Sequence, residues 1–141
     1  MFNPSRDEVR DMFFGSWRKY RAGEPLVGIE SLAVDIILLH PEYHELLSMP
    51  AQYRDKDYTD ESNPFLHMSL HLAFEEQLSI DQPPGIARLF NELLSIKGDR
   101  HGALHEALEC LAETVWRAQR DGAPPDALAY LGCLEKRARR S

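Results

Sequence analysis

NPFLHMSLHLAFEEQLSI, residues 63–80, has the hydrophobic spacing of a buried helix and begins with Asn-Pro. An Asn side chain caps the first backbone N–H groups of a helix, and Pro is favoured directly after it because no N–H is missed there. The same segment carries His67, His71 and Glu75 at steps of four residues. Because this step stacks side chains on one helix face, the segment predicts a helix with two imidazoles and a carboxylate on one side.

The segments before this helix also carry helix signals. Ser5-Arg-Asp-Glu8 fits a capping box, and the apolar residues that follow it have helical spacing up to Gly23. Pro25 is expected to open a second helix, which breaks at His40-Pro41 because proline disfavours helical geometry in the residue before it. A short turn follows the break, and residues 49–62 are polar and aperiodic, which predicts a surface loop.

Three further helices are predicted after residue 80. They run from about 84 to 97, from an Asp99 cap to about 120, and from the end of the GAPPD turn (122–126) towards the C-terminus. No segment is a convincing strand. The sequence therefore predicts an all-α protein, a single domain over residues 1–141 built as an up-down-like bundle of five or six helices.

Composition excludes several classes of protein. The 141 residues are 43% hydrophobic and 28% charged, which is typical of a globular domain. No apolar run approaches the ~20 residues of a membrane span, and the N-terminus lacks the apolar core of a signal peptide, so a cytoplasmic protein is expected. The net charge of −7 argues against general binding to a phosphate backbone, so no nucleic-acid partner is expected. The basic end, KRARRS, suits the negative end of a helix dipole.

The two cysteines, Cys110 and Cys133, lie in predicted helices and form no CxxC motif. In a cytosolic protein this arrangement is typical of reduced, structural thiols.

All six histidines occur in H-x-x-x-H pairs, which are His40/His44, His67/His71 and His101/His105. Six histidines form fifteen pairs, and each has a chance of roughly 1.4% of a four-residue separation, so about 0.2 such pairs are expected against three found. Two of the pairs lie in matching H-x-x-L-H-x-A-x-E segments that end at Glu75 and Glu109. Composition alone therefore does not explain the spacing, which indicates that the histidine pairs have a structural or functional role.

Two imidazoles on one helix face can chelate a metal ion. In an up-down bundle the helices of residues 63–80 and 99–120 run parallel, and the second helix brings His40 to the same end. We therefore expect the histidines to converge on a site for iron or zinc, with copper or nickel as further candidates. The site would hold two ions bridged by a carboxylate, or one ion bound by three histidines with an open position. The candidate metal ligands are His40, His44, His67, His71, Glu75, His101, His105 and Glu109.

An alternative interpretation is a helical adaptor without enzymatic activity, in which the histidines form a structural or pH-sensitive polar network. Either interpretation is compatible with a homodimer. HExxH, Walker, GxGxxG and GxSxG motifs are absent, so the sequence leaves open whether the protein is an enzyme, and it identifies no substrate and no protein partner.

The chain resembles a family of small bacterial proteins catalogued as domain of unknown function 1841. The resemblance rests on SRDEVRDMFFGSWRKYRAGEPL, DIILLHPEYHELL, NPFLHMSLHLAFEEQLSIDQPPGI and GDRHGALHEALECL, which together span nearly the whole chain. It implies a bacterial, stand-alone, cytosolic protein. It implies no catalytic residues, because the family is uncharacterised.

Overall fold

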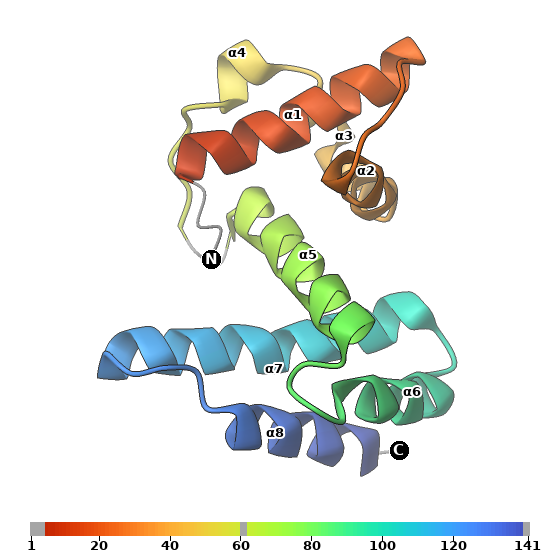
Figure 1. Cartoon of the computed structure of the whole chain (residues 1–141). Coiled ribbons are helices and arrows are strands. Elements are labelled where there is room, and N and C mark those ends of the chain that lie inside the picture. The colour runs from red at the N-terminus through yellow and green to blue at the C-terminus, as the bar shows by residue number, and fades with distance from the viewer. Residues whose placement is uncertain (1–4, 60–61, 140–141) are drawn as a thin grey trace. The chain divides into compact units, whose positions relative to one another are not determined.

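The computed structural model describes residues 5–59 and 62–139, and every regular element in this part of the chain is helical (Figure 1). The elements are α1 (Arg6–Ala22), α2 (Ile29–Leu38), the 3-10 helix η1 (Pro41–Tyr43), α3 (His44–Leu47), α4 (Pro50–Tyr53), α5 (Pro64–Ile80), α6 (Ile86–Lys97), α7 (Arg100–Asp121) and α8 (Ala127–Arg139). The predicted all-α class is confirmed. Eight α-helices are described instead of five or six, because two four-residue helices occupy segments that were expected to be a turn and a loop.

The second helix begins at Ile29 and not at Pro25, because Gly28 has a positive φ of 60° and the backbone N–H of Val27 donates to the Glu30 carboxylate. Residues 60–61 of the predicted loop, and 140–141 of the basic C-terminal segment, lie outside the described residues.

Local capping sets the start of the histidine-bearing helix α5. The Asn63 side-chain oxygen accepts hydrogen bonds from the backbone N–H groups of Phe65 and Leu66, at 3.0 and 3.1 Å. Asp99 caps α7 in the same way, through the N–H groups of His101 and Gly102. These caps set where each helix begins.

The chain divides into two compact units, Met1–Leu72 and Ala73–Ser141. The first nine residues of α5 belong to the first unit and the remaining eight to the second. The single-domain organisation stays a prediction.

The core of the first unit combines aromatic residues of α1, aliphatic residues of α2, one leucine of α3 and two residues of the first turns of α5. Its buried members are Phe13, Phe14, Trp17, Ala33, Ile36, Ile37, Leu47, Phe65 and Met68. Burial of such side chains supplies most of the stabilisation of a small helical unit. The core therefore holds the end of α2, which His40 follows, against the first turns of α5, which carry His67 and His71.

Arg10 is a buried cation in this unit, with 3% of its surface exposed. Its guanidinium donates to the carbonyl oxygens of Arg54 and Lys56, at 2.8 and 2.7 Å, and lies 4.8 Å from the centre of the Phe65 ring. Burial lowers the pKa of Arg10. These contacts tie the segment that precedes α5 to helix α1.

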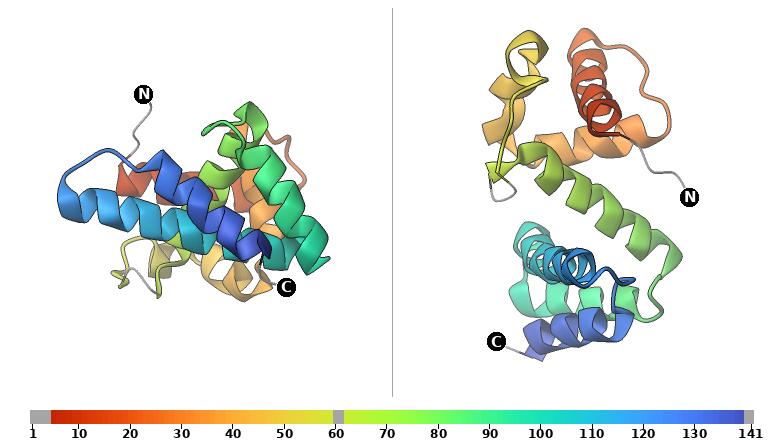
Figure 2. Two further views of the ribbon diagram at one scale, coloured as in Figure 1. Left: turned by 90° about the horizontal axis from the view of Figure 1, so that it is seen from below. Right: turned by 90° about the vertical axis from the view of Figure 1, so that its left-hand side faces the viewer.

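In the second unit, α6, α7 and α8 pack against one another, as both views of Figure 2 show. Phe74, from the end of α5, meets Phe90 of α6 with 5.2 Å between the ring centres. Tyr130 of α8 is buried, its hydroxyl donates to Gln77 at 2.7 Å, and its burial raises the pKa of that hydroxyl. Arg137 of α8 adds ion pairs to α7, so polar contacts reinforce an apolar core.

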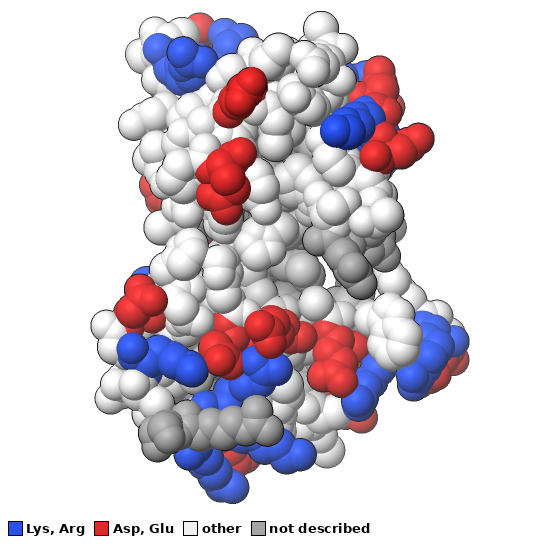
Figure 3. Space-filling model, turned by 180° about the vertical axis from the view of Figure 1, so that it is seen from behind, with Lys and Arg blue, Asp and Glu red and all other residues white. Residues whose placement is uncertain are grey.

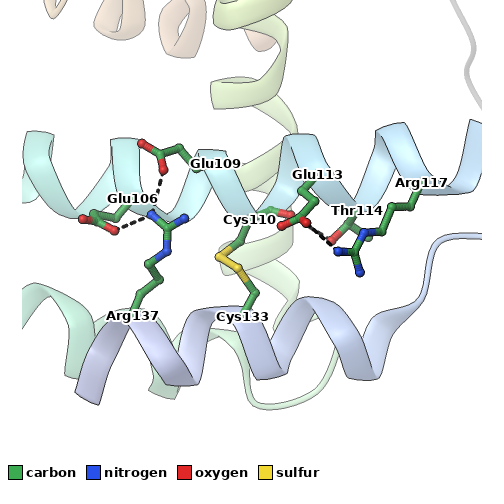
Figure 4. Close-up of a disulfide and its surroundings, with 8 residues drawn as sticks. All are labelled: Glu106, Glu109, Cys110, Glu113, Thr114, Arg117, Cys133 and Arg137. Atoms are coloured by element: carbon green, nitrogen blue, oxygen red, sulfur yellow. Dashed lines mark hydrogen bonds and ion pairs between the residues drawn. A yellow bond between two sulfur atoms is a disulfide. The ribbon is translucent and has the colours of Figure 1, made fainter. Parts of the chain in front are cut away.

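Cys110 of α7 and Cys133 of α8 form a disulfide, with 5.8 Å between their Cα atoms (Figure 4). The expectation of two reduced thiols is therefore wrong. The 23-residue separation spans the connection between two packed helices, and the packing places the two cysteines opposite each other. Spacing in the sequence does not show this contact. Because disulfides are rare in a reducing cytosol, the cytoplasmic location stays a prediction.

No helix in the described ranges combines the length and apolar character that crossing a bilayer requires. Acidic and basic side chains are interspersed on the face drawn in Figure 3.

Candidate metal centre

Three histidines of the first unit form a compact cluster, the His40–His67–His71 triad. His40 follows the end of α2, and His67 and His71 lie one turn apart on α5. The distances between ring centres are 4.9 Å for His40–His67, 4.8 Å for His40–His71 and 4.9 Å for His67–His71. The triad is therefore a nearly equilateral arrangement of three imidazoles, and its ligand nitrogens lie within 4.8 Å of one another.

The triad lies mostly away from solvent. His40 and His71 are each 1% exposed, whereas His67 is partly exposed. The H-x-x-x-H spacing places His67 and His71 on one face of α5. The break at Pro41 turns the chain so that His40 faces α5. The sequence-based prediction that these three residues meet is confirmed for this unit.

The hydrogen bonds of His40 define its tautomer. Its Nδ1 lies 2.8 Å from the carbonyl oxygen of Ile36, which only accepts, so Nδ1 carries a hydrogen. In the neutral ring, Nε2 then holds the lone pair. In that state, Nε2 of His40 accepts a hydrogen bond from Nε2 of His67, which lies 3.1 Å away.

The separation of these two nitrogens suits a shared ion. Two imidazole nitrogens bound to one tetrahedral zinc at about 2.0–2.1 Å are about 3.3 Å apart. The observed 3.1 Å is close to this value. An ion bound by both nitrogens would take the place of the hydrogen between them.

His44, His101 and His105 also make contacts within their own units. Nε2 of His44 donates to the Ile37 carbonyl oxygen at 2.8 Å, and its ring packs 4.5 Å from that of Trp17. His101 and His105 pair on the first turns of α7, in the second unit, with 4.2 Å between ring centres.

The two predicted carboxylates are engaged by arginines of the second unit. Glu75 forms an ion pair with Arg100 at 2.7 Å, and Glu109 forms one with Arg137 at 2.7 Å. Of the two neighbouring carboxylates, Glu75 is partly buried and Glu76 is exposed, so Glu75 is the one that faces inward. The candidate ligands that the structure brings together are therefore imidazoles.

Comparison with known families matches residues 5–136 to a family that is described as a domain of unknown function, DUF1841. The chain belongs to the DUF1841 family. The resemblance inferred from the sequence is therefore confirmed. Neither the curated proteins nor the solved structures contain a significant match to the chain. Membership supplies no reaction and no ligand, so the function of this DUF1841 chain rests on its own geometry.

Two neighbours of the triad in this DUF1841 chain complete the site. The Ile36 carbonyl is the partner that orients His40, and histidine ligands of metals are commonly oriented in this way. Tyr43 stacks on His40 with 5.3 Å between ring centres and an angle of 8° between the planes, and its burial raises the pKa of its hydroxyl. Ile36 lies four residues before His40, and this spacing is the signal in the sequence that could have identified its carbonyl as the partner of His40.

Proposed function

We propose that this chain binds one transition-metal ion, iron or zinc, through the imidazole nitrogens of His40, His67 and His71. The observation that carries the proposal is the approach of two Nε2 atoms to 3.1 Å beside a third buried imidazole. Three imidazole ligands suit zinc and iron, with copper and nickel as competitors. The sequence further predicts that His101 and His105 bind the same ion, and this stays a prediction.

A three-histidine site leaves at least one coordination position for water or a substrate. An ion held in this way acts as a Lewis acid or lowers the pKa of a bound water. The same ligand set also serves a purely structural ion, so the proposal concerns binding and assigns no reaction.

Binding must displace the proton between His40 and His67. Because the Ile36 carbonyl keeps hydrogen on Nδ1 of His40, that ring already presents Nε2 to the ion. His67 must present the lone pair of Nε2, by moving that hydrogen to Nδ1 when its ring is neutral, or by losing one proton to solvent when its ring is cationic. Acid therefore competes with the metal for these nitrogens, and affinity falls as the pH is lowered.

The hydrogen bond between His40 and His67 also favours the alternative interpretation. In a metal-free adaptor the same contact is a polar link within the core and stabilises the packing of α2 against α5. The two functions make opposite predictions for metal titration.

The test is isothermal titration of untagged, chelator-treated protein with Zn²⁺ and, without oxygen, with Fe²⁺. We expect one ion per chain, and a His67→Ala variant should bind at least about 100-fold more weakly, because loss of a ligand exceeds the 10–100-fold effect of losing an orienting partner. The matched control is His44→Ala, another partly exposed histidine of the same unit whose Nε2 donates to a carbonyl.

His44→Ala should retain the wild-type affinity. Absence of stoichiometric binding by the wild type, or equal losses in the two variants, would contradict the proposal. Absence of binding by the wild type favours the adaptor. A third variant, His105→Ala, tests the predicted contribution of α7.

A further inference from the structure

The disulfide of the second unit has two sulfur atoms in different surroundings. Cys110 is fully buried, whereas Cys133 is partly exposed and lines a cavity of about 460 Å³. Thr114 and Arg117 of α7 and Ala129 of α8 also line this cavity. Figure 4 shows Thr114 and Arg117 on the stretch of α7 next to the disulfide. Cys133 therefore lines the cavity, whereas Cys110 does not.

We propose that Cys110–Cys133 is a reversible thiol–disulfide exchange site that small thiols enter at Cys133. The incoming thiolate attacks Sγ of Cys133 and forms a mixed disulfide. The Cys110–Cys133 bond breaks, and its electron pair leaves on Sγ of Cys110, which takes a proton from solvent. A dithiol reductant completes the reaction, because its second thiolate attacks its own sulfur in the mixed disulfide and releases Cys133. The dithiol is oxidised and the protein disulfide is reduced.

The size of the cavity favours a small reactant. Its volume corresponds to about fifteen water molecules at about 30 Å³ each, which accommodates a low-molecular-weight thiol. The walls carry both charge signs, and Arg117 is paired with Glu113 at 2.7 Å. Access to sulfur, and not strong charge attraction, therefore decides which cysteine reacts.

Contacts other than the disulfide hold α8 in place, which makes the exchange reversible. Tyr130, Leu134 and Ala138 of α8 are all at least 95% buried. Nη1 of Arg137 lies 2.6 Å from a Glu106 oxygen and 2.7 Å from a Glu109 oxygen, both on α7 (Figure 4). After reduction the two thiols remain opposite each other, so they close again when an oxidant is supplied.

The first test compares single variants under native conditions with an aromatic disulfide reagent that reports thiol release by absorbance. Cys110→Ser leaves the Cys133 thiol, and Cys133→Ser leaves the buried Cys110 thiol. We expect the Cys133 thiol to react at least tenfold faster, and the two rates to become equal in denaturant. Equal native rates, or a faster Cys110 thiol, would overturn the proposal.

The second test uses the wild-type chain and does not depend on the folding of the variants. Dithiothreitol should reduce the disulfide without denaturant while the helical circular dichroism signal is kept, and oxidised glutathione should restore it. Peptide mapping of the glutathione adduct should place it on Cys133. Resistance to the reductant until urea is added, or an adduct on Cys110, would refute the mechanism.

A pair of substitutions tests the route of entry. Ala129→Phe fills part of the cavity wall and should slow reduction severalfold. Ala112→Phe, at an exposed position of α7 that does not line the cavity, is the control and should leave the rate unchanged. Equal rates for the two variants would show that the thiol does not enter through this cavity.

Discussion

Replacing Arg10 by Met should destabilise the first unit by about 3 kcal/mol. The substitution removes two hydrogen bonds from a charged donor to carbonyl oxygens, at 2.8 and 2.7 Å, each worth roughly 1.5 kcal/mol or more. It also removes a guanidinium–ring contact with Phe65, worth about 1 kcal/mol. Relief of the buried charge returns about 1 kcal/mol. The sum corresponds to a fall of about 10 °C in the melting temperature of a chain of this size.

The assay is urea unfolding followed by fluorescence of Trp17, which lies in the core of the first unit. Trp116, an exposed residue of α7, is first replaced by Phe so that only the first unit is observed. Arg6→Met is the matched control, because the Arg6–Asp57 ion pair is largely exposed and its loss should cost less than about 0.5 kcal/mol. Coinciding unfolding midpoints for the two variants would refute the role assigned to Arg10.

Further predictions concern the second unit. A hydrogen bond from Arg137 holds the pKa of the Glu106 carboxyl below its usual value, so its stabilisation is present above about pH 4.5 and is lost as the pH falls through the lowered pKa. Glu106→Gln should therefore cost about 1 kcal/mol in urea unfolding at pH 7 and progressively less as the pH is lowered through the pKa of the folded state, and a cost that does not change with pH would contradict this. Replacing both Cys110 and Cys133 by Ser should cost about 3 kcal/mol, from the entropy of a loop closed over 23 residues, measured by Trp116 fluorescence. Tyr130→Phe should lower the free energy of unfolding by about 1 kcal/mol through loss of one hydrogen bond, and an unchanged midpoint would show that this bond contributes nothing.

Helix boundaries were predictable where one residue determines the local geometry. The Ser5 capping box and the Asp99 cap appear as expected, and Gly98 ends α6 with a φ of 71°. The start of α2 was not predictable from Pro25, because it depends on a contact between Val27 and the Glu30 side chain. The short helices α3 and α4 carry too few residues to show a periodic pattern.

The three histidines of the triad followed from the sequence in the same way. The step of four residues predicted that His67 and His71 share a face of α5, and the break at Pro41 predicted that His40 lies at the end of α2. The partners of Glu75 and Glu109 were not predictable, because they lie 25 and 28 residues away and meet only through tertiary packing. The disulfide was missed for the same reason.

The most direct measurement of the proposed site is X-ray absorption spectroscopy at the metal edge of the zinc-loaded, untagged protein. The geometry of His40, His67 and His71 predicts at least three imidazole nitrogens at about 2.0–2.1 Å, and the loss of one of them in the His67→Ala variant. A spectrum with oxygen neighbours only, or one that is identical in the variant, would contradict the account.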